Sequence, residues 1–329
     1  MTSDPRLAKV FKTLMVVSGG DAPGINAVLM RYTELSEASG CQVVGAMGGF
    51  AGALDNKIVS LSSPMLAPLA GSAGSFLPSS REPVLRTDDG RSQLRAIIDQ
   101  HHISSIVLLG GNGSLGTLLP ILKALGVPCI GLPNTIDNDV PGTERTLGFD
   151  SACNFAYPLA NGIGQTARAL PGRIFTLETL GGDSGMLALD IALGVSADCV
   201  LLKEYDYDVK WLGLRLQNAV ARQGYALAVH SEGARDSRTL PDIIYKSTGI
   251  RVRDTRLGHA QRGATPTHVD RLLAVQMAKF AFGALRDGVK VGTVVVGNGR
   301  IQLRVGTLEG LPTPMPDRTL YDSINGFAS

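Results

Sequence analysis

The sequence is poor in the features that mark several specialised classes of protein. Its 329 residues include only four cysteines and one tryptophan. Cys41, Cys129, Cys153 and Cys199 stand far apart in apolar surroundings and lack the close spacing of zinc ligands. We therefore expect buried thiols in a reducing compartment, and neither a disulfide-stabilised secreted fold nor a zinc finger.

Long apolar runs and a strong charge imbalance are also missing. The run 106–109 is far shorter than the ~20 residues of a membrane helix, and residues 1–6 lack the apolar core of a signal peptide. Lys and Arg number 31 against 29 Asp and Glu, and the resulting net charge of +2 does not favour nucleic acid or a membrane surface as a partner. These observations predict a cytoplasmic protein.

The sequence does contain a regular alternation of short β-branched runs and longer amphipathic segments. The predicted strands cover 14–17, 42–45, 106–109, 128–131, 173–178, 199–202 and 225–229, with two more near 294 and 301. The predicted helices cover 26–38, 91–101, 114–125, 184–194, 209–222 and 266–285. This order indicates an α/β protein with two lobes, each built on a mainly parallel sheet with helices on both faces.

Two glycine-rich segments each join a predicted strand to a helix. They read SGGDAPGIN at 18–26 and GGNGS at 110–114. Adjacent glycines let a phosphate approach the backbone, and a helix N-terminus supplies N–H groups. A tight turn with a capping residue is the alternative for either segment, but two in one lobe favour a polyphosphate ligand. The chain lacks the pattern GxxxxGK[ST], so we do not expect a P-loop enzyme.

An acidic segment and a basic segment complete the motifs. TIDND at 135–139 follows a predicted strand, where one carboxylate can take the proton of an attacking hydroxyl and another can hold Mg²⁺. An Asx-rich turn is the alternative. GHAQRG at 258–263 places His259 and Arg262 three residues apart, and arginine forks suit phosphate groups. A solvated basic loop is the alternative there.

Together these segments resemble the bacterial 6-phosphofructokinases. The segments that carry the resemblance are 19–26, 74–81, 110–114, 135–139, 178–182, 232–233 and 257–271. They follow one another in the family's order, at close to its spacings. The resemblance implies the phosphofructokinase fold of two Rossmann-like lobes. The phosphoryl-donor lobe would hold 1–140 and 262–308, and the sugar-phosphate lobe 141–261 and 309–329.

The resemblance also implies a role for each matched residue. The donor-binding positions are Gly19, Arg81, Gly111, Asn112, Gly113 and Ser114. Asp137 matches the general base, Thr135 and Asp139 flank it, and Asn112 and Asp139 match the positions near Mg²⁺. The substrate-binding positions are Arg173, Leu180, Gly181, Gly182, Glu232, Arg253, His259 and Arg262. In the family, the equivalents of Arg173 and Arg253 come from a neighbouring subunit, which implies a homotetramer or homodimer.

Two positions depart from the family pattern. Asn112 stands where the family has a metal-associated Asp, and an amide is a weaker ligand for a hard cation than a carboxylate. Gly182 stands where the family has an Arg that stabilises the transferred phosphoryl group, and losing such a cation costs about 10³-fold or more in rate. Gly113 matches the ATP-dependent members, whereas Asn134 matches neither ATP-dependent nor pyrophosphate-dependent members.

Two functions stay open at this point. The first is Mg²⁺-assisted phosphoryl transfer from ATP, or alternatively from pyrophosphate, to a ketose phosphate such as fructose 6-phosphate or a heptulose phosphate. The second is a catalytically weak paralogue that binds a sugar phosphate or serves as a regulatory subunit. Because Thr135, Asp137 and the basic cluster are all present, we favour the enzyme.

Overall fold

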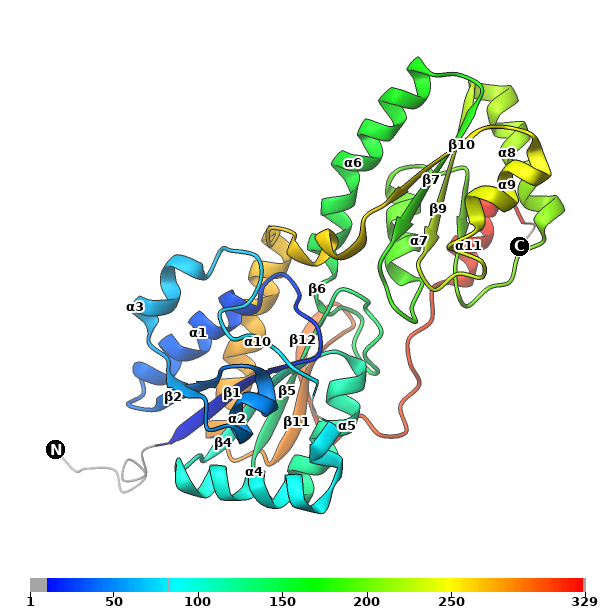
Figure 1. Cartoon of the computed structure of the whole chain (residues 1–329). Helices are drawn as coiled ribbons and strands as arrows, with labels where there is room; N and C mark the ends of the chain where they lie inside the picture. The colour runs from blue at the N-terminus through cyan, green and yellow to red at the C-terminus, as the bar shows by residue number, and fades with distance from the viewer. Residues whose placement is uncertain (1–10, 82, 328–329) are drawn as a thin grey trace. The chain divides into compact units, whose positions relative to one another are not determined.

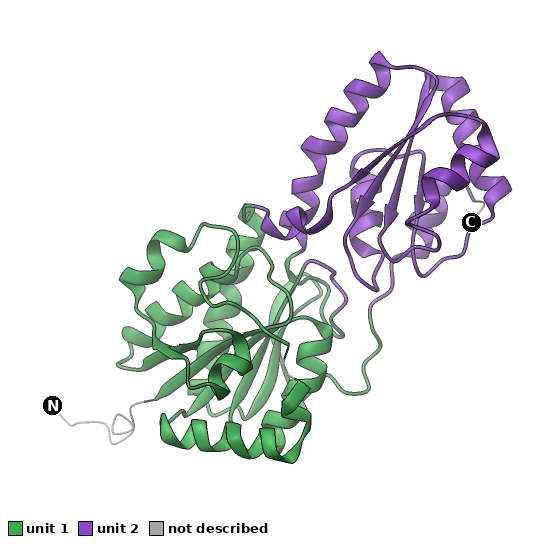
Figure 2. Cartoon of the chain, viewed as in Figure 1, with its two compact units in different colours: residues 1–135, 140–148, 265–313 green, residues 136–139, 149–264, 314–329 purple. Residues whose placement is uncertain are grey.

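The computed structural model describes residues 11–81 and 83–327, and two compact units can be separated within the chain (Figures 1 and 2). Unit 1 comprises 1–135, 140–148 and 265–313, and unit 2 comprises 136–139, 149–264 and 314–329. Residues 141–148 and 309–313 belong to unit 1, and 136–139 and 262–264 belong to unit 2, whereas the sequence-based division places each of these segments in the other lobe. Residues 1–6, on which the expectation of no signal peptide rests, lie outside the described residues.

Unit 1 is built on a mostly parallel sheet, eight-stranded among the described residues. Its order is β12-β11-β5-β4-β1-β2-β3, with β6 paired to β5, and only β3 and β12 run antiparallel to their neighbours. The strands are β1 (Lys12–Ser18), β2 (Gln42–Ala46), β3 (Ile58–Ser60), β4 (Ser105–Gly110), β5 (Cys129–Thr135), β6 (Leu147–Gly148), β11 (Val291–Gly297) and β12 (Arg300–Val305). The helices are α1 (Ile25–Glu37), α2 (Gly49–Leu54), α3 (Ser63–Leu66), α4 (Asp88–Gln100), α5 (Asn112–Ala124) and α10 (His268–Arg286), with short 3₁₀ turns at Ala67–Leu69 and Pro83–Arg86.

Alternate residues of the central strands of unit 1 fill two separate cores. In β1, Met15 and Val17 pack on the face covered by α1 and α10, whereas Leu14 and Val16 pack on the face covered by α4 and α5. This division follows from the two-residue period of a strand. Both faces are thus apolar, and the polar groups of the sheet's connections gather at the strand ends.

Unit 2 contains a smaller sheet of the order β10-β7-β9-β8, parallel throughout. Its strands are β7 (Arg173–Thr179), β8 (Cys199–Leu201), β9 (Tyr225–Ser231) and β10 (Val252–Arg256). Its helices are α6 (Phe149–Ala169), α7 (Met186–Gly194), α8 (Val209–Gln223), α9 (Leu240–Thr248) and α11 (Arg318–Asn325), with the 3₁₀ helix η4 (Gly258–Gly263). Leu212, Leu216 and Ile244 of α8 and α9 form the core on one face of this sheet.

The structure confirms the predicted α/β architecture and most of its elements. The antiparallel turn between β11 and β12 lies as predicted, with Asn298 and Gly299 at φ 52° and 68°. Two helices begin earlier in the chain than predicted. Helix α4 begins after Thr87, whose side chain accepts a hydrogen bond from Gly90 N, and α5 begins at Asn112. Eight elements were not predicted from the sequence: α2, α3, α6, α9, α11, β3, β6 and β10. Cys41 is partly exposed, contrary to the prediction, while the other three cysteines are buried.

Within residues 11–81 and 83–327, no helix is both long and apolar enough to cross a membrane.

Candidate active site

The two glycine-rich segments of unit 1 meet at the carboxyl ends of β1 and β4. These strands are adjacent, with Ser18 in register with Gly110. The Ser114 hydroxyl donates to the Ser18 carbonyl at 3.1 Å and so links the two segments. Gly19 has φ +95°, and a β-carbon there would lie 3.0 Å from Ser114 Oγ, so this close approach favours glycine.

The segment that precedes Arg81 joins the same place. Gly19 N donates to the Ser80 carbonyl at 3.1 Å, and Ser79 Oγ donates to the Gly19 carbonyl at 2.7 Å. Ser80 also pairs with Ser18 as an isolated parallel bridge. Arg81 follows directly and is exposed. The structure thus gathers the segments of Gly19, Arg81 and Ser114 at one edge of the unit 1 sheet.

Helix α5 begins at this edge. Gly111 is its N-cap residue, and Asn112, Gly113 and Ser114 form its first turn. The N–H groups of a first turn have no partner within the helix, and they present a partial positive charge. A β-carbon on Gly111 would lie 3.3 Å from Thr135 Cβ, which brings the end of β5 beside the helix start. The arrangement can bind an anion through main-chain groups.

The acidic segment leaves β5 at Thr135, which is buried and whose carbonyl accepts from Thr146 Oγ1 at 2.6 Å. The next residues, 136–139, pack with unit 2. Asn138 adopts φ 52°, a left-handed conformation that is uncommon outside glycine and that occurs at functional sites. Asp137 and Asp139 on either side are partly buried.

Two loops of unit 2 lie at or next to Asp137. The loop after β7 carries Gly182, where a β-carbon would lie 3.7 Å from Asp137 Oδ2. Gly182 N donates to Glu232 Oε1 at 2.8 Å, and Glu232 directly follows β9. Gly181 has φ +141° and lies so near the Ser184 carbonyl that a β-carbon would clash at 2.4 Å. The structure therefore brings Asp137, Gly182 and Glu232 together.

Gln261 is a positioning residue of this region to which the sequence analysis gave no role. It is fully buried, its Oε1 accepts from Leu180 N at 2.9 Å, and its Nε2 donates to the Ala152 carbonyl at 3.3 Å. These contacts join η4, and with it His259 and Arg262, to the loop after β7. The available signal was the glutamine within GHAQRG, a polar residue between two predicted phosphate ligands.

The predicted phosphate cluster is divided in this single chain. His259 and Arg262 lie in η4, beyond the carboxyl end of β10, whereas Arg173 begins β7 and Arg253 lies near the start of β10. The length of β7 separates its two ends by about 20 Å. The charge of Arg251, followed by partial desolvation and the charge of Arg173, lowers the pKa of Arg253. Arg173 and Arg253 therefore lie toward the amino ends of β7 and β10, whereas η4 follows the carboxyl end of β10.

Comparison with known proteins gives the family. The family model described as "Phosphofructokinase" matches residues 12–285. The chain belongs to the phosphofructokinase family. It is 33% identical over 290 residues to an ATP-dependent 6-phosphofructokinase of Lactobacillus gasseri, covering 87% of this chain and 90% of that protein. It is 32% identical over 313 residues to an ATP-dependent 6-phosphofructokinase of Coxiella burnetii, covering 94% of each.

The fold comparison agrees with this assignment. The structure of a pyrophosphate-dependent phosphofructokinase from Marinobacter aquaeolei matches 97% of this chain and 88% of that chain, with a TM-score of 0.84 at 21% identity. Together, family and fold make the chain a sugar-phosphate kinase of the phosphofructokinase family.

In the described part of the chain, no three His, Cys, Asp or Glu side chains gather into a group that could hold a metal ion. The predicted pair, Asn112 and Asp139, offers an amide oxygen and a carboxylate. Mg²⁺ commonly keeps several waters and binds one or two carboxylates together with substrate phosphates. The residues present fit an ion that is held mainly by the phosphates of the donor.

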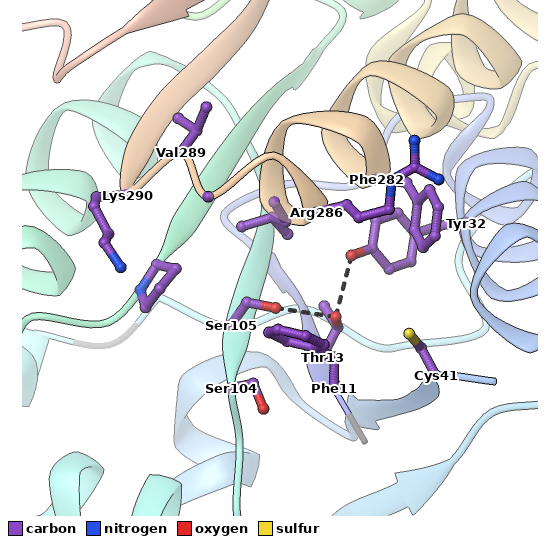
Figure 3. Close-up of a pocket in the computed structure, with 13 residues that line it drawn as sticks. Phe11, Thr13, Tyr32, Cys41, Ser104, Ser105, Phe282, Arg286, Val289 and Lys290 are labelled. Atoms are coloured by element: carbon purple, nitrogen blue, oxygen red, sulfur yellow. Dashed lines mark hydrogen bonds between the residues drawn. The ribbon is translucent and has the colours of Figure 1, made fainter. Parts of the chain in front are cut away.

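Unit 1 also contains a cavity of about 210 Å³ (Figure 3). It is lined by the amino ends of β1 and β4 and by the end of α10, including Thr13, Ser105 and Phe282. Thr13 Oγ1 lies 3.1 Å from Tyr32 Oη and 3.0 Å from Ser105 Oγ, and burial raises the pKa of Tyr32. None of the predicted site residues lines it, so it is no part of the candidate active site.

Proposed function

We propose that this phosphofructokinase transfers a phosphoryl group from ATP to a hydroxyl of a ketose phosphate. Fructose 6-phosphate is the first candidate acceptor, and a heptulose phosphate is the second. The observation that carries the proposal is the placement of Asp137 beside Gly182, next to the loop that holds Glu232. A general base belongs beside the acceptor hydroxyl, and these loops provide a polar place for a sugar.

Asp137 is the general base in this proposal. Its carboxylate accepts the proton as the acceptor oxygen forms a bond to the γ-phosphorus. The bond between that phosphorus and the bridging oxygen breaks, and ADP leaves with the electron pair. Protein groups contribute mainly by positioning and by electrostatic stabilisation in such a reaction. Thr135, at the end of β5, fixes the start of the segment that carries the base.

The joined loops of unit 1 are the proposed donor site. Gly19, Arg81, Gly111 and the first turn of α5 supply main-chain N–H groups and one cation. The ATP-dependent relatives support ATP as the donor, and pyrophosphate is the alternative. Gly113 does not decide between them sterically, because a β-carbon there would meet nothing within 4 Å.

Mg²⁺ is the proposed ion of the donor complex, with Asn112 and Asp139 as its protein ligands. When bound, it would neutralise charge on the donor phosphates. His259 and Arg262 are proposed to bind the phosphate already on the acceptor. We further propose that Arg173 and Arg253 complete the site of a neighbouring copy in a homodimer or homotetramer, and that the protein works in the cytoplasm.

The test is a turnover assay over a panel of ketose phosphates with ATP and with pyrophosphate. Turnover of at least one ketose phosphate with ATP, and none of the unphosphorylated ketose, is the expected result. Binding without turnover of any sugar phosphate would instead support the catalytically weak paralogue, which the replacements Asn112 and Gly182 favour.

A further inference from the structure

Lys203 reaches the loop that lacks the family's arginine. It follows β8, which is the next strand to β9 in the unit 2 sheet, so its loop lies beside those of Gly182 and Glu232. The ammonium group of Lys203 pairs with the carboxylate of Asp183, the residue directly after Gly182. A second contact, from Gly185 N to Glu204 Oε1 at 2.8 Å, joins the same two loops.

The stem of Lys203 and the carbonyl group of Gly182 both lie beside Gly233. A β-carbon on Gly233 would lie 2.6 Å from the Gly182 carbonyl oxygen and 3.3 Å from Lys203 Cδ. Gly233 thus lies near both, and a side chain at this position would collide with the Gly182 carbonyl. The side-chain position of Gly182 faces Asp137 Oδ2. The proposed base, the position of the missing arginine and Lys203 therefore all lie in the same region of unit 2.

The pairing with Asp183 leaves Lys203 free to bind a stronger anion. The side chains of Lys203 and Asp183 are 43% and 91% exposed. Exposed ion pairs contribute little to stability, so the more highly charged phosphate groups compete well for the ammonium group. Lys203 can also exchange partners by rotating its terminal bonds, which an arginine held in a fork does less readily.

We propose that Lys203 supplies the cation that Gly182 no longer provides, and that it contacts the phosphoryl group as this is transferred to the acceptor. The inference rests on the proposed function of Asp137. It predicts that Lys203 acts on the transferred phosphate and leaves the phosphate already present on the substrate to His259 and Arg262.

The experiment compares three substitutions in the full-length protein: Lys203→Met, Lys203→Arg and Asp183→Asn. Lys203→Met should lower kcat at least about tenfold and leave the KM for the sugar phosphate within about twofold, because the contact forms in the transition state. Lys203→Arg should keep most of the activity. Asp183→Asn should retain wild-type turnover or exceed it, because it removes only the competing anion.

Lys57→Met is the matched control. Lys57 forms an exposed pair with Asp55 in unit 1, with side chains 63% and 61% exposed, and it is no part of the proposed site. It should keep wild-type turnover. If Lys203→Met equals this control, or if Lys203→Met and Asp183→Asn lower turnover equally, the inference is wrong. The second of these outcomes would assign Lys203 a structural role in its loop.

A binding measurement keeps the test independent of turnover. Fructose 1,6-bisphosphate carries the added phosphate, whereas fructose 6-phosphate does not. Lys203→Met should weaken binding of the bisphosphate by about tenfold or more and leave binding of the monophosphate unchanged. Equal losses for both ligands would overturn the inference. Failure of the proposed function is distinguishable, since it would appear as no turnover of any ketose phosphate by the wild type, or as wild-type turnover in Asp137→Asn.

Discussion

A side chain at Gly182 would begin 3.7 Å from Oδ2 of Asp137. This distance is an ordinary van der Waals contact, so the loop after β7 places residue 182 directly against the proposed base. In this protein the position is a glycine with φ +57°. The structure thus has room for a larger acceptor, or for a cation from another loop, at the point where the family carries an arginine.

Replacing Asp137 with asparagine should abolish most of the turnover. Asp137→Asn keeps the shape of the side chain but removes the proton acceptor, and the loss of a general base costs about 10²–10⁴ in rate. The affinity for the sugar phosphate should change little. Steady-state kinetics together with equilibrium binding would check both expectations, and unchanged turnover would refute the assigned role.

Restoring the family residues should raise turnover with fructose 6-phosphate and ATP. Asn112→Asp strengthens a metal ligand and Gly182→Arg returns a cation, and both act on the transferred phosphoryl group. We expect the double variant to gain about tenfold or more in kcat, which corresponds to about 1.4 kcal/mol of barrier. Kinetics over a range of Mg²⁺ concentrations would measure the gain.

The conformation of Gly182 adds a cost to this experiment. A residue with a β-carbon at φ +57° loses about 1–2 kcal/mol, so Gly182→Arg should lower the melting temperature. Gly182→Ala is the control, because it carries the same strain without the charge. If both single variants lose the same stability and only the arginine raises turnover, charge is the cause. A loss of activity on a different sugar phosphate would instead make Gly182 a specificity residue.

The division of the basic residues predicts shared sites between subunits. Arg253→Ala and Arg262→Ala should each weaken sugar-phosphate binding by about 1.5–3 kcal/mol. If each site takes Arg253 from a neighbour, a mixed dimer of the two variants contains one intact site of its two. Because about half of the dimers are mixed after equal co-expression, about a quarter of the activity should be restored. A mixture of Arg262→Ala with His259→Ala should restore none, since both residues belong to η4.

His230 should make the stability of the protein depend on pH. It is fully buried, and burial lowers its pKa to about 4 despite the opposing charge of Asp254. Between pH 6.5 and about 4, the unfolded chain therefore binds a proton that the folded chain does not. Stability should fall as pH falls through this range, by up to about 1.4 kcal/mol per pH unit for one proton.

His230→Leu should remove this component. Urea unfolding at pH 7 and at pH 4.5 would give the free energy of unfolding for both proteins. We expect a smaller difference between the two pH values in the variant than in the wild type. An identical difference would show that other groups, such as carboxylates, account for the acid sensitivity.

Much of the fold could be predicted because its determinants are local. The runs of β1, β4 and β9 are apolar and bounded by glycine or polar residues, so their strands were found from the sequence. Helix α6 was missed because Pro158 and two glycines, Gly162 and Gly164, weaken its helical pattern. One face of α6, which includes Ala152 and Ala156, is buried against the rest of unit 2. This burial overrides the unfavourable helix propensities.

The candidate site was found in the sequence as motifs, and its spatial relationships were decided by tertiary structure. The motifs TIDND and GHAQRG identify Asp137 as a candidate base and Arg262 as a candidate phosphate ligand, because these roles depend on the type of side chain. The sequence alone could not show that Gln261 joins η4 to Leu180, or that Gly233 lies near both Gly182 and Lys203. Those contacts join residues that are distant in the chain, and they exist only because parallel strands bring their carboxyl-end loops to one edge of a sheet.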